Sequence, residues 1–115
     1  MSELRKNLDN IRAELEALYN AEYTDEERKE MENNGEAYDL YSYFNDVLDY
    51  EYTISSSREY LGAKIWVTLG GPNIHIDTRN GEIRGAWGTE RESIWLPSEI
   101  CVEIDSIFEE LYNCY

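Results

Sequence analysis

Residues 64–87 read KIWVTLGGPNIHIDTRNGEIRGAW, and this stretch decides the fold of the 115-residue chain. Asn80-Gly81 is the strongest short-range hairpin signal in it, because both residue types tolerate the positive φ angles of a two-residue turn. Residues 70–73, GGPN, give a second turn signal shortly before it. The stretch therefore predicts three short strands joined by two tight turns.

The two turns predict how the strands pair. The Asn80-Gly81 turn would place Asp77 opposite Arg84, and the GGPN turn would place Val67 opposite Ile76. Both pairings predict the same apolar core face: Ile65, Val67, Leu69, Ile74, Ile76, Ile83 and Trp87. The opposite face would carry Lys64, Trp66, Thr68, His75, Asp77, Arg79, Glu82, Arg84 and Ala86. A one-residue slip would bury these charges, so the pattern specifies the faces well.

Helical patterns flank this stretch on both sides. A first helix, ending near Asn20, is predicted by one apolar seam: Leu4, Leu8, Ile11, Leu15 and Leu18. Residues 24–27, TDEE, form a capping box that opens a short second helix to about residue 33. A third helix over 36–48 would bury Ala37, Leu40, Tyr41, Phe44, Val47 and Leu48. A last helix begins at Pro97, which suits a first turn. Its buried face would hold Ile100, Cys101, Ile104, Ile107, Phe108 and Leu111.

The order of these elements predicts one α+β domain over residues 1–115. Residues 1–49 form an acidic helical region, 50–96 an antiparallel meander of four strands, and 97–115 a C-terminal helix packed on one sheet face. The first strand, over 50–55, would turn Tyr52 and Ile54 toward the core. Residues 88–95 are a candidate fifth strand at the edge.

The charge of the chain is strongly and unevenly acidic, with 25 acidic and 10 basic residues and a net charge of −15. Residues 13–51 hold thirteen carboxylates against Arg28 and Lys29, residues 57–97 hold five acids and five bases, and residues 98–115 hold five acids and no base. Such a field repels nucleic acid and anionic membranes and attracts basic proteins. We therefore expect no direct contact with nucleic acid or membrane.

The remaining composition indicates a cytoplasmic protein with reduced thiols. No apolar run approaches the length of a membrane span, and the N-terminal pattern is amphipathic, unlike the apolar core of a signal peptide. Cys101 and Cys114 are too few for a disulfide framework. We expect a monomer or a small homo-oligomer.

The sequence offers no signature of catalysis. His75 is the single histidine, and no local pattern places a nucleophile beside it. The GGPN turn lacks the Lys-Ser/Thr pair of a phosphate loop and precedes a strand. The acidic residues of the second helix do not have the spacing of a calcium loop. We therefore expect a protein that is not an enzyme, with no catalytic residue, cofactor or metal.

Seven of the ten tyrosines lie between Tyr19 and Tyr52, among the thirteen carboxylates. Carboxylates beside exposed aromatic rings suit a surface that binds Arg and Lys through ion pairs and cation–π contacts. The predicted partner-binding residues are Glu14, Glu16, Glu22, Tyr23, Asp25, Glu26, Glu30, Tyr38, Asp39, Tyr43, Asp46, Asp49, Glu109 and Glu110. The alternative site is the open sheet face around Trp66, His75, Asp77 and Arg84. A plainly acidic protein with partly buried tyrosines is equally compatible with the composition.

Three segments carry a resemblance: residues 69–78, LGGPNIHIDT, residues 83–87, IRGAW, and residues 104–112, IDSIFEELY. They resemble small acidic proteins of phages and conjugative elements of Gram-positive bacteria, over roughly the last fifty residues. Such proteins include inhibitors of restriction and CRISPR enzymes, which often present carboxylates where the enzyme expects phosphates. The resemblance implies the same role here, and it carries over no individual binding residue.

Two functional hypotheses follow from the sequence. In the first, the acidic helices bind and inhibit, or act as a decoy for, a basic nucleic-acid-handling protein through phosphate mimicry. In the second, the chain is a protein-binding or immunity module that uses the open sheet face around Trp66.

Overall fold

The computed structural model describes residues 2–45 and 49–114. Three helices come first: α1 (Glu3–Asn20), α2 (Asp25–Asn33) and α3 (Leu40–Phe44). The strands β1 (Asp49–Ile54), β2 (Tyr60–Thr68), β3 (Asn73–Asp77), β4 (Glu82–Trp87) and β5 (Glu90–Trp95) then precede α4 (Ser98–Asn113). All neighbouring strands pair antiparallel, in chain order, in one open sheet. The α+β class is confirmed, and the candidate fifth strand is present.

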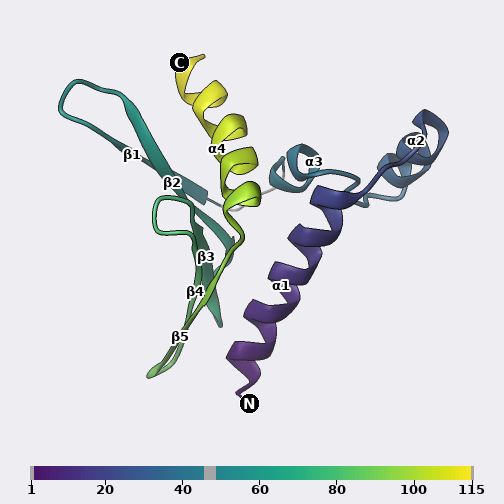
Figure 1. Cartoon of the computed structure of the whole chain (residues 1–115). Coiled ribbons are helices and arrows are strands. Elements are labelled where there is room, and N and C mark those ends of the chain that lie inside the picture. Colours follow the sequence, from purple (N-terminus) through teal and green to yellow (C-terminus); the bar gives the residue numbers. More distant parts are fainter. Residues whose placement is uncertain (1, 46–48, 115) are drawn as a thin grey trace.

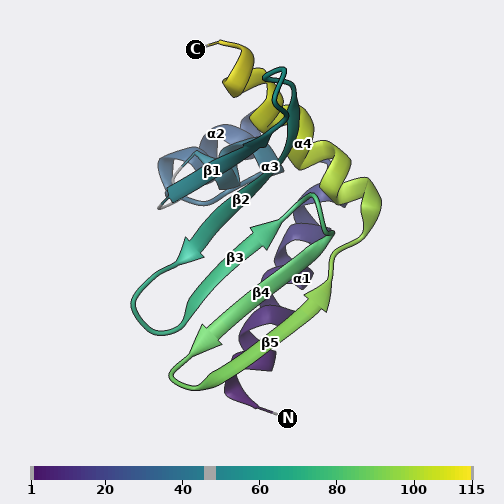
Figure 2. The ribbon, with the colours of Figure 1, turned by 90° about the vertical axis from the view of Figure 1, so that its left-hand side faces the viewer.

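The helices lie on one side of the sheet and leave its other face open (Figure 1). In Figure 2 the open face is turned toward the viewer, and α1 and α4 lie behind the strands. Helix α1 packs on β4 and β5, and α4 packs on β2. The core between the layers is formed by fully buried side chains: Leu4, Leu8, Leu15, Ile65, Ile74, Ile76, Ile83, Ile100, Ile104 and Phe108.

Helix α1 lies close against β4 because of one glycine. A Cβ atom at Gly85 would lie 2.8 Å from Leu4 Cδ1 and 3.1 Å from Leu8 Cδ2, so any larger residue there would force these buried leucines to shift. The side chain of Ser2 caps the helix by accepting a hydrogen bond from the Arg5 amide at 3.0 Å.

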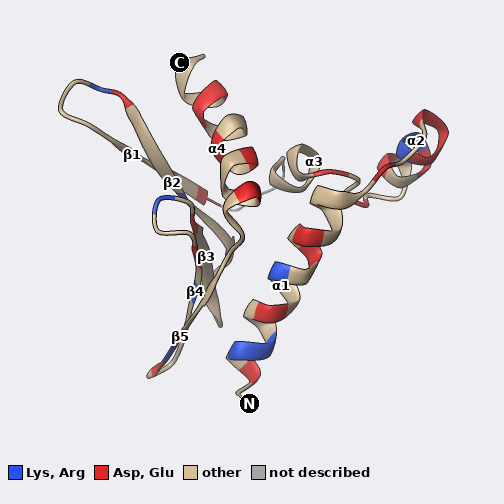
Figure 3. Ribbon diagram, viewed as in Figure 1, with Lys and Arg blue, Asp and Glu red and all other residues tan. Residues whose placement is uncertain are grey.

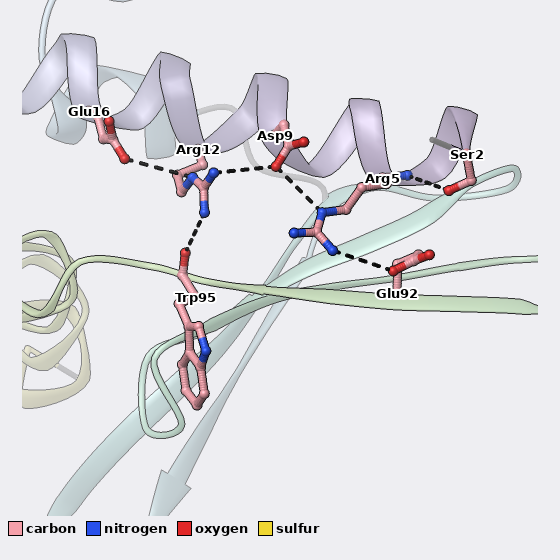
Figure 4. Close-up of polar contacts among 7 residues, drawn as sticks. All are labelled: Ser2, Arg5, Asp9, Arg12, Glu16, Glu92 and Trp95. Atoms are coloured by element: carbon pink, nitrogen blue, oxygen red, sulfur yellow. Dashed lines mark hydrogen bonds and ion pairs between the residues drawn. The ribbon is translucent and has the colours of Figure 1, made fainter.

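An ion pair and a hydrogen bond also join α1 to β5 (Figure 4). Arg5 Nη1 lies 3.8 Å from Glu92 Oε2, and Arg12 Nη1 donates to the Trp95 carbonyl at 3.3 Å. These groups are partly exposed, so each contact contributes at most about 1 kcal/mol.

The predicted pairing at Asn80-Gly81 is wrong by two residues. Asp77 lies opposite Glu82, and Arg84 lies opposite His75, so the connection has four residues. The Asp77 carboxylate accepts hydrogen bonds from the Asn80 amide at 3.2 Å and from Asn80 Nδ2 at 2.8 Å. Gly81 has a φ of +67°, whereas Asn80 does not adopt a positive φ, so the two-residue turn does not form. A shift of two residues leaves each side chain on its predicted face.

The β2–β3 pairing is shifted by two residues as far as Trp66 and by one residue beyond it, where Thr68 lies opposite the core residue Ile74 and not on the predicted open face. Ile65 lies opposite Ile76, and an irregularity in the ladder falls at Val67. Leu69 lies beyond the end of β2 and is 52% exposed, so its predicted place in the core is wrong. Trp87, at the far end of β4, is 43% exposed, and its predicted place in the core is also wrong. Ile54, at the end of β1, is 46% exposed, so its predicted place in the core is wrong; the ladder is irregular there, with Leu61 of β2 left unpaired.

The third helix is shorter than predicted at its N-terminal end. The Asp39 carboxylate accepts from the Ser42 amide at 2.8 Å, and the Ser42 hydroxyl accepts from the Asp39 amide at 3.1 Å. This capping box starts the helix at Leu40 and not at residue 36. Tyr41 is consequently 57% exposed and not part of the core face. Residues 46–48 lie outside the described residues.

The other predicted elements are confirmed. Helix α1 buries its leucine seam, and α2 carries the predicted capping box at Thr24. Helix α4 follows Pro97 and buries Ile100, Cys101, Ile104 and Phe108. Among the described residues, no helix has the length and apolar character needed to cross a membrane.

Many of the aromatic residues pack together where β1, β2 and α4 meet. This cluster consists of Tyr43, Phe44, Tyr50, Tyr52, Tyr60, Phe108 and Tyr112, whose rings contact in series at centroid distances of 5.1–6.3 Å. The Tyr60 hydroxyl donates to Asp105 Oδ1 at 2.7 Å. Burial raises the pKa of Tyr60, and the hydrogen bond to Asp105 and its charge raise it further. Packing therefore accounts for several of the tyrosines that the sequence associates with a binding surface.

Candidate functional site

A groove of about 640 Å³ lies where the end of α1, the start of α3 and one side of α4 meet. Its carboxylates are Glu22, Asp39, Glu103 and Glu110; its aromatic rings are Tyr19 and Tyr41; and its apolar side chains are Leu18, Leu40 and Ile107. We call these nine residues the acidic groove. No Lys or Arg is among the described residues that line it.

The backbone around the groove adds to its negative field. Helix α1 ends at Asn20 with no basic residue in its last turn, so the partial negative charge of its C-terminus is not offset there. On α4, Glu103, Ile107 and Glu110 recur at spacings of four and three residues and share one side of the helix. Figure 3 shows the acidic residues of α1, α2 and α4 in red.

The carboxylates of the groove are mostly free to bind a cation. Asp39 Oδ1 is engaged by the Ser42 amide. Glu22, Glu103 and Glu110 are exposed and form no ion pair with any residue that the structure describes. The groove therefore presents three carboxylates with no cationic partner among the described residues.

The aromatic and apolar side chains suit the groove to a basic side chain. Tyr19 is 42% and Tyr41 57% exposed, while Leu40, which also lines the groove, is buried. The carbon stem of a Lys or Arg would lie on the apolar floor, and its charged head would reach the carboxylates and the tyrosine rings. Elsewhere in the chain, the Arg28 guanidinium lies 5.6 Å from the ring centre of Tyr38, an internal example of this contact.

Three of the residues predicted from the sequence come together in the groove, namely Glu22, Asp39 and Glu110. The α2 residues Asp25, Glu26 and Glu30 do not, because α2 projects away from the body of the molecule and buries no residue (Figure 1). The predicted acidic surface is thus divided into separate parts.

Other predicted residues have local roles. Tyr43 packs against the core, and burial, followed by the charge of Glu14, raises its pKa to about 12. Glu16 lies 3.8 Å from Arg12 and is paired within α1 (Figure 4). The Tyr38 ring is covered by Arg28.

The last predicted residues lie elsewhere. Tyr23 is partly buried just before α2, and Glu109 is exposed on α4, where its charge contributes to the raised pKa of Tyr60. Asp49 lies on the open sheet face, opposite Trp66. Asp46 lies outside the described residues.

Sequence reasoning missed three residues of the groove: Tyr19, Tyr41 and Glu103. Tyr19 lies off the leucine seam of α1, which is a usable signal of exposure. Glu103 shares the four-and-three spacing with Ile107 and Glu110. Tyr41 had no such signal, because its exposure follows from where α3 begins.

The alternative site also forms a hollow, of about 790 Å³, on the open face of the sheet. Trp66, His75, Arg84, Ala86, Arg91 and Ser93 line it, and we call these residues the sheet-face hollow. Asp77 was predicted to be exposed there, but it is only 2% exposed because its carboxylate turns to Asn80. Burial lowers the pKa of His75, and the cations Lys64 and Arg84 act in the same direction.

The remaining reactive groups show little sign of activation. Burial raises the pKa of the Cys101 thiol to about 11, so the thiolate is disfavoured. Within residues 2–45 and 49–114, no three His, Cys, Asp or Glu side chains converge in a way that would hold a metal ion.

Comparison with protein-family models, with curated proteins and with solved structures gives no match to this chain.

Proposed function

We propose that this protein is a non-catalytic binding protein that engages a basic, nucleic-acid-handling protein and occupies the surface meant for nucleic acid. The observation that carries the proposal is the acidic groove, in which unpaired carboxylates on α4 and after α1 surround exposed tyrosines above an apolar floor. The resemblance to acidic proteins of phages and conjugative elements supports the same class of partner.

The arrangement of charge suits phosphate mimicry. A nucleic-acid-binding surface presents Arg and Lys to a row of phosphates. The groove presents Glu103 and Glu110 along one side of α4, with Glu22 across from them. Carboxylates accept bidentate hydrogen bonds from guanidinium groups much as phosphates do.

A matched pair of variants tests the groove. The first replaces Glu22, Glu103 and Glu110 with Gln, and the second replaces the exposed α2 residues Glu26, Glu30 and Glu32 with Gln. Both remove three negative charges, but only the first alters the groove. Binding to an Arg-rich peptide is measured by calorimetry. We expect a loss of about tenfold or more for the groove variant, and a loss of under about threefold for the α2 variant, since salt screens distant charges.

The class of partner is tested by capture on the immobilised protein from a bacterial lysate, at low and high salt. The bound proteins should be basic, should elute with rising salt, and should be displaced by added double-stranded DNA. The groove variant should fail to retain them. Equal capture by the two triple variants, or retention that ignores both salt and DNA, would exclude phosphate mimicry.

The same capture experiment separates the second hypothesis, a protein-binding module that uses the open sheet face. In that case Trp66→Ala would abolish capture and the groove variant would not. Our proposal expects the reverse.

A further inference from the structure

The sheet-face hollow has a chemistry opposite to that of the acidic groove. Two guanidinium groups line it, from Arg84 on β4 and Arg91 on β5. Of the acidic residues that the structure describes, Glu92 lines the hollow, and its carboxylate lies 3.8 Å from Arg5 Nη1, beneath α1 on the covered side of the sheet (Figure 4). Asp49 lies next to the hollow, opposite Trp66 on β2. The end of the hollow on β4 and β5 is therefore cationic in a strongly anionic protein.

One wall of the hollow is aromatic. Trp66 and His75 are paired across β2 and β3, and their ring centres lie 5.0 Å apart with 31° between the planes. His75 Nε2 is shielded from solvent and has no hydrogen-bond partner among the described residues. An unsatisfied buried polar atom costs about 1–3 kcal/mol, so a ligand that formed a hydrogen bond with this nitrogen would offset that cost.

The two cations lie on the next strands: Arg84 is the cross-strand neighbour of His75, and Arg91 on β5 lies opposite Ala86. Arg91 Nη1 donates to the carbonyls of Gly88 and Glu90, both at 3.0 Å, which fixes the guanidinium at the rim. Arg91 has no carboxylate within ion-pair distance in the part of the chain that the structure describes. Arg84 forms one exposed ion pair, through Nε to Glu82 at 3.6 Å, which is weak.

We propose that the sheet-face hollow binds a nucleoside monophosphate, with its base against the Trp66–His75 pair and its phosphate between Arg84 and Arg91. Neighbouring strands lie about 4.8 Å apart, so Arg84 on β4 lies about 5 Å from His75 on β3 and about 10 Å from Trp66 on β2, and Arg91 lies one strand further, on β5. A base, a ribose and a 5′-phosphate extend over such a span. The volume of the hollow falls in the range of small-molecule sites, about 300–1,000 Å³.

The charge of the protein favours a single nucleotide over a strand. A monophosphate carries one compact anionic group that the two guanidinium groups can match. A longer strand would meet Asp49 and Glu51 on the same open face and the field of the acidic helices beyond it. This proposal does not depend on the proposed function, because it uses the opposite face of the sheet.

The test is a titration of the ¹⁵N-labelled full-length protein followed by NMR. The probes are adenosine 5′-monophosphate, adenosine, which lacks the phosphate, and inorganic phosphate, which lacks the base. We expect saturable shifts at the Trp66 indole, Ala86 and Ser93 with the monophosphate. Its dissociation constant should be at least about tenfold lower than that of either fragment.

Matched variants decide whether the hollow is responsible. Arg84→Gln and Arg91→Gln should each weaken binding of the monophosphate by about tenfold, and Trp66→Ala should weaken both the monophosphate and adenosine. Arg79→Gln, in the β3–β4 turn and outside the hollow, removes the same charge and should change nothing. Unchanged core resonances show that each variant is folded.

Three results would overturn the proposal. The first is the absence of saturation by the monophosphate up to about 10 mM, and the second is an equal loss in the Arg79 variant. The third is tighter binding of a single-stranded hexanucleotide than of the monophosphate, which would indicate a strand-binding surface.

Discussion

The acidic groove and the sheet-face hollow lie on opposite sides of one sheet and are built in different ways. Side chains of the hollow stand in a row across adjacent strands, since Trp66, His75, Arg84 and Ser93 are consecutive partners. Side chains of the groove come from two helices, a helix start and the segment after α1, with no shared backbone ladder.

The two sites also differ in what supports them. The groove lies over the packed side of the molecule, where helices and sheet enclose the core, whereas the hollow lies on a face that no described helix covers (Figure 2). Substitutions on the two faces of the sheet should therefore differ mainly in how much they lower the free energy of unfolding. The predictions below test this difference, beginning with the largest expected effect.

The largest difference is expected between two leucines. Leu8 is fully buried between α1 and the sheet, so Leu8→Ala should lower the free energy of unfolding by about 2–5 kcal/mol. Leu69 lies beyond the end of β2 and is exposed, so Leu69→Ala should change it by less than about 0.5 kcal/mol. Urea denaturation measures both. A comparable loss in the two variants would mean that the β2–β3 turn is covered in solution.

A smaller difference is expected between neighbours on β4. Gly85→Ala would place a methyl group 2.8 Å from Leu4 Cδ1, and the resulting overpacking should cost about 1–3 kcal/mol. Ala86→Ser, on the open face, should cost less than about 0.5 kcal/mol. Thermal and urea unfolding of the two variants provide the measurement. If Gly85→Ala were neutral, α1 would not pack against β4 as closely as the structure indicates.

Two tyrosines allow a finer test, which separates a tyrosine that packs in the aromatic cluster from one that lines the acidic groove. Tyr60→Phe removes the hydrogen bond to Asp105, which should lower the free energy of unfolding by about 1 kcal/mol, since the site is only partly buried. Tyr19→Phe, in the acidic groove, should leave stability unchanged because its ring is exposed. Equal losses would contradict the distinction between the aromatic cluster and the groove.

The contrast between the two faces of the sheet explains how much of the structure could be predicted from the sequence. Strand positions follow a period of two, so a pairing error of two residues, as at Asp77, still leaves each side chain on the correct face. That error arose because the Asp77 carboxylate binds Asn80 three residues on, a local turn contact that competes with the two-residue Asn80-Gly81 turn. The identity of the hollow's wall, Trp66 and His75 on one open face, was therefore predictable.

The acidic groove was predictable only in composition. Its position depends on where α3 begins, which is set by the capping box of Asp39 and Ser42. It also depends on how α1 and α4 pack on the sheet. Helical periodicity places Glu103 and Glu110 on one side of α4, yet it does not say which helix lies beside them. Helix α2 projects from the body and so divides the acidic surface (Figure 1). The sequence carries no signal of this either, because periodicity does not say which elements lie beside each other.

The smallest effect concerns the protonation of His75. Burial lowers its pKa below the ordinary value of about 6.5; Lys64 and Arg84 lower it further, while Asp77 and Glu51 oppose the shift. In the unfolded chain His75 takes up a proton below about pH 6.5, whereas the folded protein does so only at lower pH. Stability should therefore fall as the pH drops from about 7 to about 5.5, and His75→Gln should remove part of that fall.

The difference between the wild-type and His75→Gln curves isolates this effect, because carboxylates that titrate at lower pH are common to both proteins. The histidine pKa is read directly from the NMR shifts of its ring during a pH titration. A pKa at or above about 6.5, or parallel stability curves for the two proteins, would mean that the ring is solvated and that the aromatic wall of the hollow is more open than the structure indicates.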